Sequence, residues 1–112
     1  MARKADIGEL EQLVLLAALR LEDRAYAPEI ARLLEEHAER ELSRGTLYAA
    51  LDRLEGRGLI EWSIEGGDSG GRASRKRRRF TVTAAGVETL AAARQTLLSL
   101  WDGLERRFEE RA

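Results

Sequence analysis

The most informative absence in this sequence of 112 residues is cysteine, which does not occur at all. Without cysteine the chain has no disulfides, thiolate metal sites or cysteine nucleophiles, and the small disulfide-bonded scaffolds typical of secreted proteins are excluded. Histidine occurs once, at His37, and a single histidine without cysteine is too small a set for a metal site or a Ser-His-Asp active site. We therefore expect no metal, no cofactor and no catalytic residues.

Long apolar runs are also missing. The longest covers residues 13–19, whereas a membrane-spanning helix needs roughly 20 apolar residues. This run also lacks the flanks and the cleavage site of a signal peptide. We expect a cytoplasmic protein without a membrane partner. Its length suits one domain with a small core, of a size that oligomerisation often extends.

Charge is unevenly distributed along the chain. The formal net charge is -1, yet residues 43–80 contain nine basic and five acidic residues, so the rest of the chain is acidic. Such segregation favours one surface that faces a polyanion. Most of the basic residues follow the glycine-rich run 66–71 and lie between Arg72 and Arg79.

Three helices are predicted before the glycines. Asp6 and Glu9 have the spacing of a capping box for the first helix, and Pro28 suits the first turn of the second. Ser43 is a good N-cap for the third, which the segment 56–58 ends with a glycine. The third helix buries one apolar stripe: Leu47, Ala50, Leu51 and Leu54.

A β-hairpin and a last helix follow. Residues 59–65 and 79–82 alternate between apolar and polar side chains on either side of the glycines, which is typical of two paired strands. Thr83 is expected to cap a final helix of about 25 residues, with a heptad-like seam that Arg94 interrupts. The seam exceeds what a small core covers, so we expect its second half to pair with a partner chain. Apolar residues all round the first helix, among them Leu15 and Leu16, also favour cover by another subunit.

This order predicts a mainly α-helical winged helix-turn-helix with a two-stranded β-wing. Its third helix would enter the DNA major groove and its wing would lie over the backbone or minor groove. Gly45 is small enough for close approach to base edges. Hydrogen-bond donors gather near the start of the third helix, where the helix dipole favours phosphate. They are Ser43, Arg44, Thr46 and Tyr48.

The segment LSRGTLYAALDRLEGRGLIEW at 42–62 resembles the PadR family of bacterial winged-helix transcription regulators. The segments GELEQLVLLAALRLEDRAY at 8–26, FTVTAAG at 80–86 and WDGLE at 101–105 are similar to members of the same family, as is GGR at 70–72. The resemblance implies a homodimeric repressor that binds a near-palindromic site on double-stranded DNA. It implies that residues 1–83 form the DNA-binding domain and residues 84–112 the dimerisation helix.

Site residues follow from the same resemblance. The DNA contacts implied are those of the third helix and of the wing: Ser43, Arg44, Gly45, Thr46, Tyr48, Arg72, Arg75, Lys76, Arg77 and Arg78. The dimer surface would use the first and last helices. Its candidate residues are Leu15, Leu16, Leu97, Trp101, Leu104 and Phe108. Small members of the family bind planar apolar molecules at the dimer interface, so Trp101 is a candidate ligand-lining residue as well as a plain dimer aromatic.

Two other functions stay open at this point. The acidic balance of the chain is compatible with a winged-helix module that binds protein instead of DNA. An enzyme has less support, because the carboxylates follow helix-surface spacing and the glycines at 66–71 lack the Gly-Lys-Ser/Thr ending of a phosphate loop.

Overall fold

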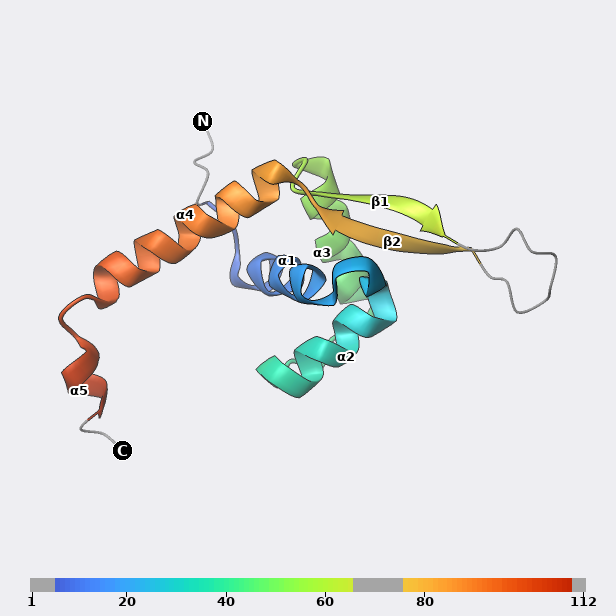
Figure 1. Ribbon diagram of the computed structural model, residues 1–112. Helices are drawn as coiled ribbons and strands as arrows, with labels where there is room; N and C mark the ends of the chain where they lie inside the picture. Colours follow the sequence, from blue (N-terminus) through green and yellow to red (C-terminus); the bar gives the residue numbers. More distant parts are fainter. Residues whose placement is uncertain (1–5, 66–75, 110–112) are drawn as a thin grey trace.

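The computed structural model describes residues 6–65 and 76–109 (Figure 1). Within these ranges the chain is mainly helical, with one two-stranded antiparallel sheet, as the sequence predicts. The elements in chain order are α1 (Glu9–Leu21), the 3₁₀ turn η1 (Glu22–Arg24), α2 (Ala27–Ala38), α3 (Arg44–Gly56), β1 (Ile60–Glu65), β2 (Arg77–Val82), α4 (Ala84–Trp101) and α5 (Glu105–Glu109). In this part of the chain, no helix is long and apolar enough to cross a membrane.

Most helix ends lie where the sequence places them. The side chain of Ser43 accepts a hydrogen bond from the backbone N–H of Thr46 at 3.1 Å, and Thr83 accepts one from Gly86 at 3.0 Å. The prediction of a capping box formed by Asp6 and Glu9 at the first helix is wrong. Gly8 is the N-cap of α1, and the backbone carbonyl of Asp6 instead accepts a hydrogen bond from Arg57.

The core lies between the three N-terminal helices and the hairpin. The face of α1 that contains Val14 and Leu15 is 0% exposed because α2, α3, β2 and α4 all contact this helix. The predicted stripe of α3 is buried in full. Phe80 of β2 is the largest of the fully buried side chains. The helix-turn-helix and the hairpin therefore share one hydrophobic core.

The hairpin register explains which of its side chains reach the core. Trp62 pairs with Phe80, and Ile64 pairs with Arg78, so these four side chains share one face. Phe80 is buried and Trp62 half-buried, whereas Ile64 is 51% exposed. The apolar face thus ends before the strands do, and this end of the hairpin projects beyond the core (Figure 1).

Helix α4 is shorter than the final helix that the sequence predicts. It ends at Trp101, and Gly103 then takes a left-handed φ of 84°, a conformation that suits glycine. The short helix α5 follows, and Phe108 packs on Trp101 with 4.8 Å between ring centroids. The expectation of one continuous helix of about 25 residues is therefore wrong, because the chain turns at residues 102–104. Figure 1 shows α4 leading away from the helical core, on the side opposite to the hairpin.

Candidate nucleic-acid interface

The outer face of α3 presents small and polar residues. Arg44, Gly45, Thr46 and Ala49 are exposed, and Tyr48 is half-buried. A methyl group built on Gly45 would meet no atom within 4 Å, so this part of the helix is open to an approaching surface. The structure thus places every predicted contact residue of α3 on its accessible side.

Hydrogen bonds at the start of α3 fix the orientation of its hydroxyl groups. Besides accepting from the Thr46 N–H, the Ser43 hydroxyl donates to the Thr46 hydroxyl oxygen at 2.8 Å. Both groups lie at the positive end of the helix dipole, which attracts phosphate. This end of α3 is therefore a donor surface.

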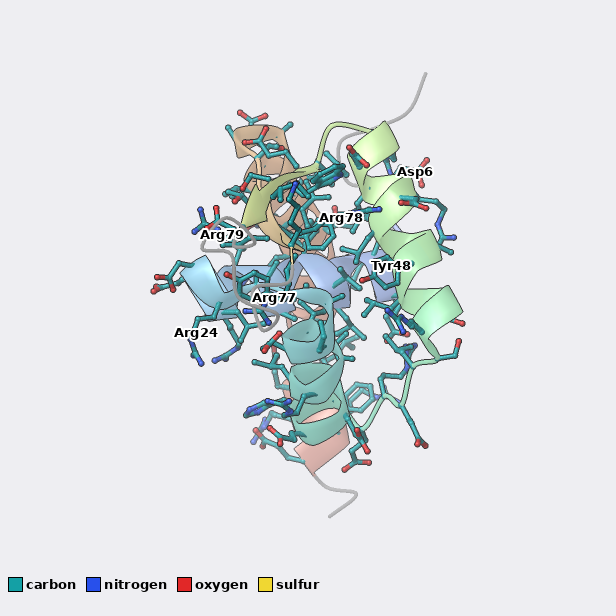
Figure 2. All side chains as sticks on the ribbon, turned by 90° about the vertical axis from the view of Figure 1, so that its right-hand side faces the viewer. Asp6, Arg24, Tyr48, Arg77, Arg78 and Arg79 are labelled. Carbon is teal, nitrogen blue, oxygen red and sulfur yellow. The ribbon has the colours of Figure 1, made fainter. Side chains whose placement is uncertain are left out.

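The wing arginines are more constrained than the sequence suggests (Figure 2). The guanidinium carbon of Arg77 lies 3.8 Å from the ring centroid of Tyr26, and that of Arg78 lies 4.7 Å from the ring of Trp62. Arg79 forms an ion pair with Glu65 at 3.2 Å. Each of the three arginines in β2 thus has a partner within the protein.

The other wing positions differ from these arginines. Lys76 is exposed and, among the residues that the structure describes, has no ion-pair or hydrogen-bond partner. Arg72 and Arg75 lie outside the described residues. Sequence reasoning treats the basic run as one group, but the structure separates Lys76 from the arginines that follow it.

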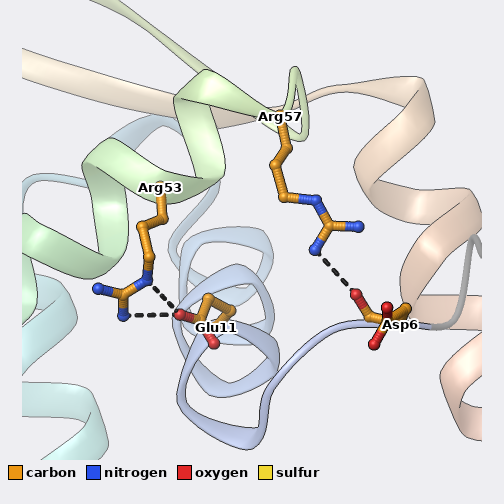
Figure 3. Close-up of polar contacts among 4 residues, drawn as sticks. All are labelled: Asp6, Glu11, Arg53 and Arg57. Atoms are coloured by element: carbon orange, nitrogen blue, oxygen red, sulfur yellow. Dashed lines mark hydrogen bonds and ion pairs between the residues drawn. The ribbon is translucent and has the colours of Figure 1, made fainter. Parts of the chain in front are cut away.

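Two contacts between the N-terminal part of the chain and the C-terminal end of α3 were not foreseen from the sequence (Figure 3). Arg53 places its Nε at 2.7 Å and a terminal nitrogen at 2.6 Å from Oε2 of Glu11. Arg57 donates to the backbone carbonyl of Asp6 at 2.9 Å. The partners are 42 and 51 residues apart in the sequence, so no local pattern points to them. The Arg53 pair joins α3 to α1, and the Arg57 bond joins the residue after α3 to the segment before α1.

A large apolar groove lies between α1 and α4. It measures about 610 Å³ and includes Leu16 and Leu19 of α1 with Leu97 and Trp101 of α4. The exposed fractions of Leu16, Leu97 and Trp101 are 47%, 52% and 44%. A second, smaller hollow beside it is lined by Leu97, Leu100, Trp101, Leu104 and Phe108.

One predicted member of this surface lies elsewhere. Leu15 is 0% exposed and packs in the core, because the buried side of α1 includes positions 14, 15 and 18. Leu15 is therefore a core residue, and the expectation that it faces a partner chain is not supported. The neighbouring Leu16 is turned outward, onto the groove.

Sequence and structure comparisons identify the family. A model of the "Transcriptional regulator PadR-like family" matches residues 15–92, from α1 into α4, and includes the hairpin. The chain belongs to this family. The PadR-like match agrees with the resemblance carried by residues 42–62. Among curated proteins no significant match is found.

Two PadR family regulators and one further protein of known structure have the same fold. A PadR family regulator from Clostridium difficile R20291 is 27% identical, with a TM-score of 0.68 over 92% of this chain and 97% of its own. A PadR family regulator from Eggerthella lenta DSM 2243 is also 27% identical, with a TM-score of 0.65 over 90% and 87%. The complex structure of hsRosR-S1 is 25% identical, with a TM-score of 0.68 over 98% and 90%. The family supports DNA-binding transcriptional regulation.

Proposed function

We propose that this PadR-like protein is a cytoplasmic homodimeric repressor that binds a near-palindromic operator. Residues 1–83 would form the DNA-binding domain and residues 84–112 the dimerisation segment. The observation that carries the proposal is the position of the wing beside α3. Arg78 of β2 lies 6.0 Å from the ring of Tyr48, so the basic strand and the exposed start of α3 form one surface.

This surface has the chemistry that DNA recognition needs. Hydroxyl and guanidinium donors lie at the N-terminal end of α3, where Gly45 leaves room for base edges. The wing adds positive charge next to them, from Lys76 onward in the described strand. We expect α3 to enter the major groove and the wing to follow the phosphate backbone.

The groove between α1 and α4 supports the dimer. Exposed leucines and Trp101 form a continuous apolar surface of the kind that soluble proteins cover. A second copy related by two-fold symmetry would cover it with the same residues. Such a dimer would present its two α3 helices to successive major grooves about 34–36 Å apart.

Release of the repressor is proposed to involve an apolar ligand in the same groove. A planar molecule in contact with Trp101 would occupy space shared by both copies and change their relative angle. The size of the groove, about 610 Å³, lies within the range of small-molecule sites.

The alternative is a winged-helix module that binds an acidic protein. Its support is the pairing of Arg77, Arg78 and Arg79 within the protein, together with the overall charge of -1. This function predicts no binding to any DNA at low salt, and a wing that is covered by the partner.

Selection of bound fragments from random DNA, with and without apolar ligands, tests the proposal. A near-palindromic consensus is expected. Contacts to about four phosphates per subunit give a slope near -7 for log affinity against log salt. Replacing Thr46 by Ala should change the preference between operators, because Thr46 lies at the exposed start of α3. Affinity that does not vary with salt, or no enrichment of any sequence, would overturn DNA binding and favour the protein module.

A further inference from the structure

The alternation of β2 sends Arg77 and Arg78 to opposite faces of the hairpin. On each face the arginine meets an aromatic ring from a different element. This arrangement is unexpected for residues whose only task is to meet phosphate, since a solvated phosphate contact needs no aromatic platform. The Tyr26 ring belongs to the start of α2, whereas Trp62 belongs to the hairpin and the ring of Tyr48 in α3 lies 6.0 Å from Arg78.

Arg77 connects the wing to the start of α2. Its guanidinium lies 3.8 Å from the ring centroid of Tyr26, the N-cap residue of α2, and 4.0 Å from Oε2 of Glu29 in the first turn. Three residues further along β2, the N–H of Phe80 donates to the carbonyl of Ala25 at 2.8 Å. The Phe80 backbone and the Arg77 side chain thus both contact the segment that leads into α2.

Arg78 connects the opposite face of the wing to α3. Its guanidinium lies 4.7 Å from the ring of Trp62 on the neighbouring strand and 6.0 Å from the ring of Tyr48. Trp62 is itself packed against the core beside Phe80. The cation therefore lies between the hairpin and the helix that is proposed to contact bases.

We propose that Arg77 and Arg78 are positioning residues that hold the wing at a fixed angle to α3 by cation–π stacking. The expected effect on operator binding rests on the proposed DNA-binding function, whereas the contacts between the arginines and the rings do not. A planar guanidinium stacks on a ring in a way that a lysine ammonium does not reproduce, so arginine is required where charge alone is not enough. Phosphate contact would then depend on residues nearer the tip, such as Lys76.

Lysine substitution separates stacking from charge. Arg78→Lys keeps the charge, and we expect it to weaken operator binding roughly tenfold in the dimer while the salt slope stays the same. The matched control is the exposed Lys76. Lys76→Gln removes a charge and no stacked ring, so it should reduce the dimer's salt slope by about two, because one phosphate contact per subunit is lost.

A measurement without DNA tests the contact between Arg78 and Trp62 by itself. The chain has two tryptophans, so Trp101→Phe leaves Trp62 as the only tryptophan emitter. In that background Arg78→Lys should alter Trp62 emission, and Lys76→Arg should not. In a variant that contains neither tryptophan, Arg77→Lys should likewise change the tyrosine emission, because Arg77 lies over the ring of Tyr26.

The possible results are distinguishable. Unchanged Trp62 emission, or wild-type operator affinity in Arg78→Lys, would overturn the positioning role. If no variant and no wild-type protein binds DNA while Trp62 emission responds as expected, the stacking geometry stands and the proposed function fails instead.

Discussion

The two ends of the molecule use aromatic side chains in opposite ways. The wing end comprises α3, the hairpin and the start of α2, and the C-terminal end comprises α5 and the second half of α4. At the wing end Tyr26, Tyr48 and Trp62 face arginines, and Phe80 is buried. At the C-terminal end Trp101 and Phe108 pack on each other and stay nearly half exposed.

The difference is between aromatic side chains that are contacted within one protomer and apolar side chains that one protomer leaves exposed. At the wing end, the three arginines of β2 meet aromatic rings or a carboxylate within the protomer, and Phe80 lies in the packed core. The C-terminal end exposes four leucines besides its two rings, namely Leu97, Leu98, Leu100 and Leu104. Because exposed apolar area costs free energy in water, this end is expected to be stable only when something covers it.

The largest expected effect comes from the core of the wing end. Phe80→Ala should lower the free energy of unfolding by about 3–5 kcal/mol, because it removes a side chain that is 2% exposed and leaves a cavity. Chemical denaturation at low protein concentration measures this. The control is Phe108→Ala, whose side chain is 46% exposed. If both substitutions cost the same free energy, the contrast between the two ends is wrong.

A charge in the α1–α4 groove should act on assembly and leave the fold intact. Leu97→Asp is expected to weaken the proposed dimer at least about 100-fold, since an unpaired carboxylate would be buried between the two copies. Analytical ultracentrifugation across a concentration series checks this. The matched control is Ile64→Asp on the hairpin, because Ile64 is 51% exposed and Leu97 is 52% exposed. A wild-type protein that is monomeric at every concentration would contradict the dimer.

Much of the wing end could be predicted from the sequence because its signals are local. Ser43, the stripe of α3 and the alternation of the strands each specify structure within a few residues. The partners of Arg77, Arg78 and Arg53 are different. They come from elements brought together only by the fold, and no periodicity encodes a guanidinium over Tyr26 or a pair with Glu11.

The C-terminal end was less predictable for a related reason. The apolar seam continues through Leu104 and Phe108, and continuity of the seam favours one unbroken helix. A single glycine at 103 changes the outcome, since it takes a positive φ at no steric cost and turns the chain back on Trp101. Leu15 and Leu16 show the same limit, because an apolar residue on a helix can face either a core or a partner.

The cap of α3 should have a moderate effect. Ser43→Ala removes the side-chain acceptor for the Thr46 N–H and should cost about 1 kcal/mol of stability. Thermal denaturation is sufficient to measure this. Ser99→Ala in the exposed second half of α4 is the control, where a change close to zero is expected. Equal effects at the two serines would show that the hydrogen bond of Ser43 contributes nothing particular.

The smallest effect concerns the ion pair that fixes α3 on α1. A double-mutant cycle with Arg53→Gln and Glu11→Gln should give a coupling of about 0.5–1 kcal/mol, at the upper end for exposed pairs. Both Nε and a terminal nitrogen of Arg53 contact one carboxylate oxygen, and the Glu11 side chain is only 17% exposed.

The pair between Arg40 and Glu9 is the control for this cycle, because it also joins α1 to a distant residue. Its distance is similar, 2.8 Å, but its side chains are 38% and 79% exposed. Water and salt reach it more easily, so its coupling should be smaller and should fall further at 1 M salt. If the two cycles give the same coupling at both salt concentrations, burial does not strengthen the Arg53 pair. The attachment of α3 to α1 would then depend mainly on its buried leucines, with no measurable contribution from the carboxylate of Glu11.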